Sequence, residues 1–409
     1  MGNTLVTNEM ATFEVAMYFV NSLRGVAQFN REYKDEFSSS GGKVGDTVKI
    51  RLPQEWETTE GEALSEQNLM DRYVNLIINR RRHVGFGFTS SESTLDLDDV
   101  RNRYVQPAAE TLASVYDRLA LADVFKSVFN VVGTPGTTPS AALTYSQARV
   151  KILDFAGPDE GLVAVLDPLA GATIADSTKG YFTPQDKIGQ NWSKGMFAPE
   201  QLGIAKWLQD QQIPRFTTGA TTTATPLVNG AAQTGSSIVT DGWGSGNTSL
   251  KKGDVVTFAG VYAVNPLSKE STGRLHQFVL TADASDTTGV VTLPISPSIV
   301  TSGPFQNVTA APADNATITY WSMAAGGTQN ATVTPQNLVF HPKAFTSVMI
   351  DLAKPVGGAE FERVSSKMLN CSIRYVRQYD VKDDKNRSRL DILFGSAAIQ
   401  PRMACRVVG

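Results

Sequence analysis

A change in composition between residues 216 and 334 constrains the fold of this chain more than any other feature. This stretch is rich in Thr, Ala, Gly and Ser, carries little charge and contains short alternating runs such as GDVVTFAGV and HQFVLTA. Short strands at regular spacing predict an all-β sandwich or barrel. The sequence on either side has mixed helix and strand character. We therefore expect an α+β fold with an inserted all-β domain, whose flanking halves, 136–215 and 335–409, complete one another.

Length and charge set limits on the class of protein. A chain of 409 residues exceeds the usual size of a single hydrophobic core, so two or three substructures are expected. The 37 Lys and Arg against 40 Asp and Glu give a net charge of -3. A surface with this balance is no polycation, so any contact with DNA should be local and weak.

Cysteine usage and hydropathy indicate the compartment. Cys371 and Cys405 are too few for a disulfide framework, and we interpret both as buried thiols in a reducing environment. The opening residues lack the pattern of a signal peptide, and no run of about 18 apolar residues occurs. The sequence predicts a soluble protein made in a cytoplasm, with no membrane contact.

The first ninety residues predict a helix and a long hairpin. Apolar residues with helical spacing lie between Asn8 and Phe37, at Met10, Phe13, Met17, Val20 and Leu23, and predict an arm that faces a partner surface. Alternating residues from Val48 to Leu52 and an extended run from Val74 to Phe88 predict two paired strands. Such a hairpin needs a partner surface to be ordered.

The mixed segments predict a long helix and several shorter elements. Pro107 suits the first turn of a helix over 107–130. We expect a helix at SQARVKILDFAG, a buried strand at LVAVLDP and then a polar loop through Lys179. After Pro335, LVFHPKAFTSVMIDL predicts a strand followed by a helix. Residues 371–409 predict an antiparallel pair and a last strand.

Catalytic and metal-binding patterns are missing from the sequence. The three histidines, His83, His276 and His341, lie in no recognisable ligand spacing. A catalytic role for His341 is conceivable, but no nucleophile elbow accompanies it and a turn histidine is the commoner case. The glycine-rich pieces lack the Lys-Ser/Thr of a phosphate loop. We expect no catalytic residue, no metal and no cofactor.

The charged residues of the hairpin suggest contacts between subunits. Its acidic tip, with Glu55, Glu57, Glu60 and Glu62, has three interpretations: a metal or acid/base site, a solvated loop, or an interaction loop, and we favour the last. The candidate basic partners on an adjacent subunit are Lys382, Lys385, Arg387 and Arg389. Arg80 and Arg82 would contact carboxylates of a neighbouring subunit or, less often, phosphate.

Five stretches follow one another along the chain: GDTVKIRLP, VGFGFTSSESTLDLDDVRNRYVQPAAETLA, KKGDVVTFAGV, FHPKAF and YDVKDDKNRSRLDILFG. In these stretches and in the order of its elements, the chain resembles the tailed-bacteriophage major capsid proteins, and more narrowly the podovirus coat-protein branch with an inserted β-barrel domain. No single motif is diagnostic, and the specificity lies in their order and spacing.

The resemblance implies a domain plan. It assigns an N-terminal arm to 1–37, an extended loop to 38–90, a peripheral domain with a spine helix to 91–135, an axial domain to 136–215, the inserted β-barrel domain to 216–334, and closing axial and peripheral parts to 335–409.

The resemblance also implies a non-enzymatic structural function. Such proteins self-assemble into pentamers and hexamers of an icosahedral shell around a scaffolding protein, with a portal protein at one vertex, and enclose double-stranded DNA. The implied location is the virion capsid, after assembly in the bacterial host cytoplasm. A tail-tube or decoration protein is the structural alternative, although neither needs a long helix beside an overlapping hairpin. A capsid protease or glycan hydrolase is the enzymatic alternative, but the sequence nominates no nucleophile or carboxylate pair for it.

Overall fold

The computed structural model describes residues 8–33, 45, 47–62, 64, 66–89, 105–178, 201–221, 225–243, 248–285, 289–321, 331–355, 360–366, 371–383 and 385–409. They form two compact units, each assembled from separate stretches of the chain. The first comprises Met1–Ile50, Val74–Leu121 and Thr346–Ala397, and the second comprises Arg51–Tyr73, Ala122–Phe345 and Ala398–Gly409.

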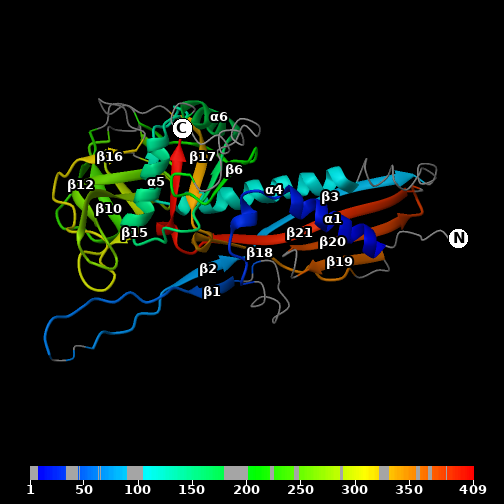
Figure 1. Cartoon of the computed structure of the whole chain (residues 1–409), viewed down its shortest axis with the longest axis horizontal. Coiled ribbons are helices and arrows are strands. Elements are labelled where there is room, and N and C mark those ends of the chain that lie inside the picture. The colour runs from blue at the N-terminus through cyan, green and yellow to red at the C-terminus, as the bar shows by residue number, and fades with distance from the viewer. Residues whose placement is uncertain are drawn as a thin grey trace. The chain divides into compact units, whose positions relative to one another are not determined.

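The first unit is built on a five-stranded sheet in the order β18-β21-β20-β19, with β3 also paired to β21 (Figure 1). Its strands are β3 (Arg80–Thr89), β18 (Phe345–Met349), β19 (Glu360–Ser366), β20 (Cys371–Asp380) and β21 (Lys385–Ala398). The antiparallel pair predicted after residue 371 is confirmed as β20 and β21. The helix predicted after His341-Pro342 is wrong, because a short 3-10 turn, η5 (Pro342–Ala344), leads into the fully buried strand β18.

Two helices, α1 (Asn8–Ser22) and α4 (Gln106–Val124), contribute to the core of the first unit. The rings of Phe19 on α1 and Tyr116 on α4 stack at 5.8 Å, and Tyr116 meets Phe394 edge-on at 4.7 Å. The predicted apolar face of the arm is wrong in part, because Phe19 is buried whereas Met17 is 45% exposed. The helix therefore packs inside its own subunit. The predicted long helix over 107–130 ends earlier, and its last residues form η4 (Phe125–Ser127) and an extended segment.

A buried carboxylate on α4 holds the turn after α1. Asp117 accepts the backbone N–H groups of Arg24, Gly25 and Val26 at 2.8, 3.2 and 2.7 Å. These residues precede and begin the 3-10 helix η1 (Val26–Gln28), whose first N–H groups lack partners within the helix. The charged acceptor on α4 takes the place of a local cap.

The predicted hairpin is divided between two sheets. Only β1 (Thr47–Arg51) and β2 (Tyr73–Ile77) pair with each other, whereas β3 joins the sheet of β21. The expectation of one returning strand from Val74 to Phe88 is therefore wrong. Ile78, between β2 and β3, is fully buried, and a side chain at Gly395 would collide with the carbonyl oxygen of Ile77. The N–H of Gly45, just before β1, still donates to the carbonyl of Ile78 at 2.6 Å, and beyond this point β3 pairs with β21 instead.

The second unit contains a mixed sheet in the order β4-β22-β17-β5-β6, with β7 also paired to β17. The strands are β4 (Val131–Gly133), β5 (Val163–Leu166), β6 (Lys206–Gln209), β7 (Arg215–Thr217), β17 (Val333–Phe340) and β22 (Ala404–Val408). Strand β22 runs antiparallel to β17 and parallel to β4. A further 3-10 turn, η6 (Pro401–Met403), precedes β22.

Helices α5 (Ala142–Asp154) and α6 (Pro168–Thr178) share a core with this sheet. Tyr145 and Ile152 of α5 pack in that core with Ala164, Trp207 and Val407 from three strands. The polar loop predicted through Lys179 is wrong for residues 168–178, which form α6. Asp167 caps this helix by accepting the N–H of Leu169 at 3.2 Å, and Pro168 occupies the first turn.

Between β7 and β17 the described residues form strands joined by turns and loops, without a helix, and have a core of their own (Figure 1). One sheet has the order β16-β12-β13-β15-β10-β9 and another has the order β14-β11-β8. The strands are β8 (Ala220–Thr221), β9 (Leu227–Val228), β10 (Gly235–Asp241), β11 (Thr248–Leu250), β12 (Val255–Val264), β13 (Ser271–Leu280), β14 (Ala284–Ser285), β15 (Val291–Ile299) and β16 (Ile318–Tyr320). Their core includes Trp243, Phe258 and Phe278, all fully buried. The predicted boundaries of this domain stay a prediction.

Candidate assembly surfaces

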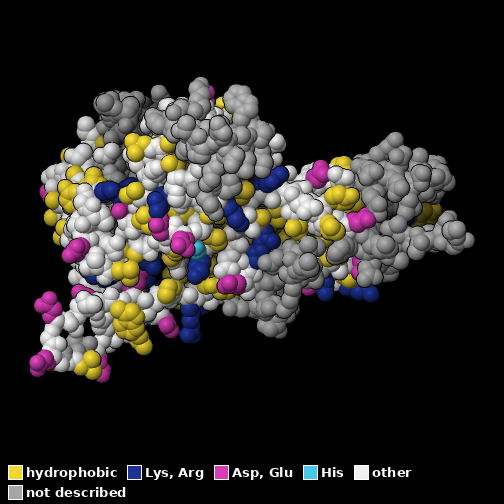
Figure 2. Space-filling model, in the orientation of Figure 1, with side chains coloured by type: hydrophobic (Ala, Val, Ile, Leu, Met, Phe, Trp, Pro, Cys, Tyr) yellow, Lys and Arg dark blue, Asp and Glu magenta, His cyan; other side chains and the backbone are white. Residues whose placement is uncertain are grey.

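The loop of residues 51–73 exposes large apolar side chains beside its acidic ones (Figure 2). Trp56, Leu64, Leu69 and Met70 are between 58% and 86% exposed. Isolated apolar residues on a surface are ordinary, but several on one loop indicate a surface that another molecule covers. The sequence analysis singled out only the charges of this loop.

Glu55 lies at the root of the loop. Its carboxylate accepts hydrogen bonds from Arg72 at 3.1 Å and from Arg402 at 2.8 Å. The Arg72 guanidinium also lies over the ring of Phe305, 3.9 Å from the centroid. Glu55 was predicted to meet a neighbouring subunit, but its side chain is only 16% exposed and is bound within its own chain.

The other three predicted glutamates, Glu57, Glu60 and Glu62, are exposed. A side-chain bridge spans the loop beside Glu57: Gln67 accepts the N–H of Glu57 at 3.1 Å and donates to the carbonyl of the same residue. This bridge joins the two sides of the loop through the backbone of Glu57, and the three carboxylates stay exposed to solvent. These three remain candidates for contact with a partner.

One face of the sheet in the first unit carries most of its charge. The strand register places five arginines on it, Arg81, Arg363, Arg374, Arg387 and Arg389, and we call this the arginine face. The opposite face bears Leu390, Ile392 and Phe394, which belong to the core. Period-two alternation within KNRSRLDILF could have separated the two faces, but it did not reveal Arg81, Arg363 or Arg374 as members.

Asp391 organises the centre of the arginine face. This buried carboxylate accepts hydrogen bonds from Arg374 and, at 2.6 Å, from Arg389, and forms an ion pair with Arg81 at 3.5 Å. Burial alone would raise the pKa of Asp391, but the hydrogen bonds from Arg374 and Arg389 hold it below its usual value. The carboxylate therefore stays charged and keeps the arginine side chains in fixed positions.

The remaining predicted basic residues lie around the arginine face. Arg387 forms ion pairs with Asp380 at 3.0 Å and Asp383 at 2.6 Å. Lys382 and Lys385 are exposed in the adjoining turn and at the start of β21. Arg82 is exposed on β3, one residue out of phase with Arg81, and Arg80 is half-buried at the start of the same strand. Arg387 and Arg389 are thus already paired within their own chain.

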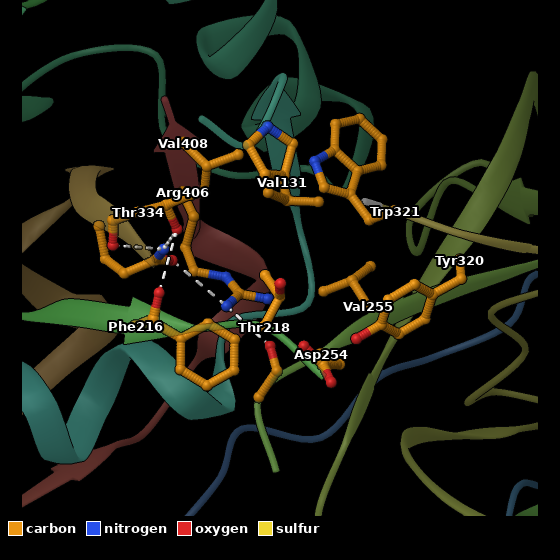
Figure 3. A pocket seen from close by; sticks show the side chains of 13 residues that line it. Val131, Phe216, Thr218, Asp254, Val255, Tyr320, Trp321, Thr334, Arg406 and Val408 are labelled. Carbon is orange, nitrogen blue, oxygen red and sulfur yellow. Dashed lines mark hydrogen bonds between the residues drawn. The ribbon is translucent and has the colours of Figure 1, made fainter. Parts of the chain in front are cut away.

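A small pocket lies in the second unit, lined by Arg406 of β22, by Gln336 of β17 and by Asp254 (Figure 3). Arg406 is 2% exposed and donates to the carbonyl of Gly253 at 2.8 Å. Burial raises the pKa of Asp254 to about 6, although the hydrogen bonds from the N–H groups of Lys251 and Gly219 and the charge of Arg406 oppose it. The cavity volume of about 20 Å³ matches one water molecule, not a substrate. Its residues connect β22 with the β-rich insert through the hydrogen bond from Arg406 to Gly253.

The histidines have structural environments. His276 is buried and stacks on Phe129 at 5.4 Å and on Phe278 at 4.4 Å. His341 caps the turn η5 through its Nδ1, which accepts the N–H of Lys343 at 3.2 Å. Both cysteines are buried as free thiols, as predicted.

The described part of the chain shows no metal or membrane motif. Among those residues no three His, Cys, Asp or Glu side chains are grouped so that they could bind a metal ion. None of the described helices has both the length and the apolar character that crossing a bilayer requires.

Comparison with known proteins decides the family. Residues 26–409 match the family model of the P22 coat protein, gene protein 5. The chain belongs to the P22 coat protein family. It is a phage coat protein with an α+β fold, and the resemblance to tailed-phage major capsid proteins is confirmed.

Solved structures of phage proteins are similar to this coat protein. A chain from Mycobacterium phage Che8 has 13% identity and a TM-score of 0.44, with 94% of this chain and 90% of that chain covered. The capsid of Ralstonia phage GP4 has 9% identity and a TM-score of 0.44, with 94% and 87% covered. The CUS-3 coat protein I-domain has 29% identity and a TM-score of 0.19 and covers 25% of this chain and 98% of its own. A search of curated proteins found no match.

Proposed function

We propose that this coat protein is the major capsid protein of a tailed phage, which self-assembles into pentamers and hexamers of an icosahedral shell around double-stranded DNA. Membership of the P22 coat protein family carries the proposal. Because that family is structural, we also propose a role without catalytic turnover. A scaffolding protein, a portal protein and weakly bound packaged DNA are the partners, and assembly takes place in the host cytoplasm.

The exposed loop supports assembly. In the single subunit, residues 51–73 expose Trp56, Leu69 and Met70 to solvent. Burial of these side chains in a contact would be favourable. Contact with a second subunit would cover them. A tail-tube or decoration protein would be β-rich too, but the family match favours the capsid.

The arginine face suits the acidic part of the loop on a neighbouring subunit. Glu57, Glu60 and Glu62 are exposed and negative, while among the described residues Lys382 and Lys385 add positive charge beside the arginines. Each exposed ion pair contributes only about 0.2–1 kcal/mol. Repetition at every subunit makes the sum significant for the lattice, and dependence on salt follows.

Electron microscopy tests the proposal. The full chain is expressed alone and together with its phage's scaffolding protein, and both samples are examined by negative stain and sedimentation. We expect closed shells, open sheets or capsomers. A chain that remains a monomer in both samples, at concentrations where related coat proteins would assemble, contradicts the capsid assignment.

A further inference from the structure

The root of the loop is fixed by side chains from three separate parts of the second unit. Glu55 lies near the start of the loop, Arg72 near its end, and Arg402 in η6. The ion pairs of Glu55 therefore join both ends of the loop to a turn that is distant in the sequence. The carboxylate is 16% exposed and the Arg402 side chain 25% exposed. The pair with Arg402 is therefore less screened than a surface pair, whereas the Arg72 side chain is 41% exposed.

A second contact ties the same root to the β-rich insert. Arg72 lies over Phe305, which comes from the segment between β15 and β16. The neighbouring backbone is bound as well, because the Lys269 ammonium donates to the carbonyl of Pro304. Lys269 also interacts electrostatically with the carboxylates of Glu55 and Glu57. The Arg72 guanidinium therefore contacts a carboxylate and an aromatic ring simultaneously, a geometry that lysine does not reproduce.

Beyond this root the loop has little to hold it. The described contacts that close it are the N–H of Leu52 to the carbonyl of Arg72 at 2.9 Å and the bridge of Gln67 to Glu57. Leu64, Leu69 and Met70 pack on nothing that would bury them. A loop with so few contacts would sample many directions if the root were released.

We propose that Glu55, with Arg72, Arg402 and Phe305, is a latch that fastens the loop to its own subunit and presents residues 56–71 in one direction before a neighbour arrives. The latch residues are positioning residues. Holding a binding segment in its bound direction lowers the conformational entropy lost on association. This role in presentation rests on the proposed function, whereas the latch itself is a property of the single subunit.

Hydrogen exchange of the unassembled full chain tests the latch. In Glu55→Gln the ion pairs with Arg72 and Arg402 are lost, and we expect the amides of Leu52 and Glu57 to exchange roughly tenfold faster. Glu60→Gln removes the same charge from the exposed part of the loop, and its exchange should stay within about twofold of the unaltered chain. Equal exchange in Glu55→Gln and the unaltered chain overturns the latch.

A second variant and a second measurement keep the outcomes separate. Phe305→Leu keeps an apolar side chain but removes the ring under Arg72, so it should also speed exchange if Glu55→Gln fails to fold. Shell formation with scaffolding protein should be slower in Glu55→Gln than in Glu60→Gln. Faster exchange with an unchanged assembly rate would keep the latch and overturn its role in presentation. If the unaltered chain forms no shells, the proposed function fails while the exchange result still decides the latch.

Discussion

Phe216 and Thr334 lie opposite each other in the antiparallel pair β7–β17, although 118 residues separate them in the sequence. Arg215 pairs with Pro335 and Thr217 with Val333 in the same register. The chain therefore leaves the mixed sheet and returns to it at neighbouring positions. The described residues between these positions have a buried apolar core of their own, which includes Trp243 and Phe258. Val255 and Val279 also pack with Phe129 and Val131 of the flanking sequence.

The first prediction concerns this insert. Because its ends are adjacent and its core is internal, residues 216–334 expressed alone should fold. We expect β-type circular dichroism, dispersed amide resonances and one cooperative unfolding transition. Spectra of a disordered chain, or a clear helical signal, would show that the insert depends on the flanking sheet.

The second prediction concerns acid sensitivity. Burial lowers the pKa of His276 to about 3, whereas an unfolded chain takes up this proton near pH 6.5. Stability is thus lost as the pH falls from about 6.5 to about 3, by roughly 2–4 kcal/mol for this group. His276→Phe should remove that loss and still fill the space between Phe129 and Phe278. Urea midpoints between pH 4 and 7 measure it.

Asp254 changes the stability in the opposite direction over the same pH range. Its folded pKa of about 6 lies above the ordinary value, so the folded chain binds a proton first and this group adds stability as the pH falls from about 6 toward 4. That contribution remains in His276→Phe. The exposed His83 provides the matched variant, and His83→Phe should leave the acid loss in place. If His276→Phe keeps the pH dependence of the unaltered chain, the buried ring is not its source.

The third prediction concerns Arg406. In Arg406→Leu the charged Asp254 loses a nearby positive charge and the carbonyl of Gly253 loses a donor, which should cost about 1–3 kcal/mol at pH 8. The loss should be smaller at pH 5, because a protonated Asp254 needs no cation. Arg274→Leu breaks the half-exposed pair with Asp154 and should cost about 1 kcal/mol or less. Urea unfolding at the two pH values compares them, and a pH-independent loss would exclude the charge of Asp254 as the cause.

The fourth prediction concerns Asp117. Asp117→Asn replaces an acceptor of three backbone N–H groups by a group that also donates, so the turn between α1 and η1 should lose about 1.5–3 kcal/mol. Glu110→Gln on the same helix disturbs only an exposed hydrogen bond from Gln106 and should cost about 0.2–0.5 kcal/mol. Chemical denaturation of the unassembled chain gives both values. Similar values for the two variants would mean that the turn does not need its charged acceptor.

The fifth prediction separates assembly from folding. Reversal of Glu57, Glu60 and Glu62 to lysine should leave the melting temperature of the single subunit nearly unchanged, since exposed carboxylates hold no core. Shell yield should fall sharply, and more so at low salt, where repulsion from the arginine face is least screened. Glu55 is excluded from this set because it belongs to the latch. Normal shell yield at low salt would argue against the contact between loop and arginine face.

Period and composition predicted some elements well. The antiparallel pair β20–β21 follows from alternation, and the start of α4 follows from Pro107 in its first turn. The β-rich insert follows from a low charge density and many short runs. These signals are local, and local chemistry is what a single sequence displays most directly.

Other elements depend on contacts that a single sequence hides. The change of partner strand after Ile78 lies beside a close approach to Gly395, more than 300 residues away, and alternation continues across it. Strand β18 is buried along its whole length, so its short apolar run has no period that distinguishes strand from helix. Helix α6 had a start signal in Asp167-Pro168, but its Gly and Thr content favoured a loop. The ion pairs of Glu55 were not predicted, because their partners Arg72 and Arg402 are distant in the sequence.

The adjacency of β7 and β17 makes the subunit a natural acceptor for foreign sequence. A graft at this position begins and ends on hydrogen-bonded neighbours, so the two termini of a replacement must lie about one strand spacing apart, near 5 Å. The replacement must also cover the apolar side chains of Phe129 and Val131, which the insert buries. Exchange of the insert for an unrelated compact domain of this kind would then keep the register of β7 and β17. In a shell of the kind proposed, such a graft would be repeated at every subunit and would display its cargo in a dense, regular array.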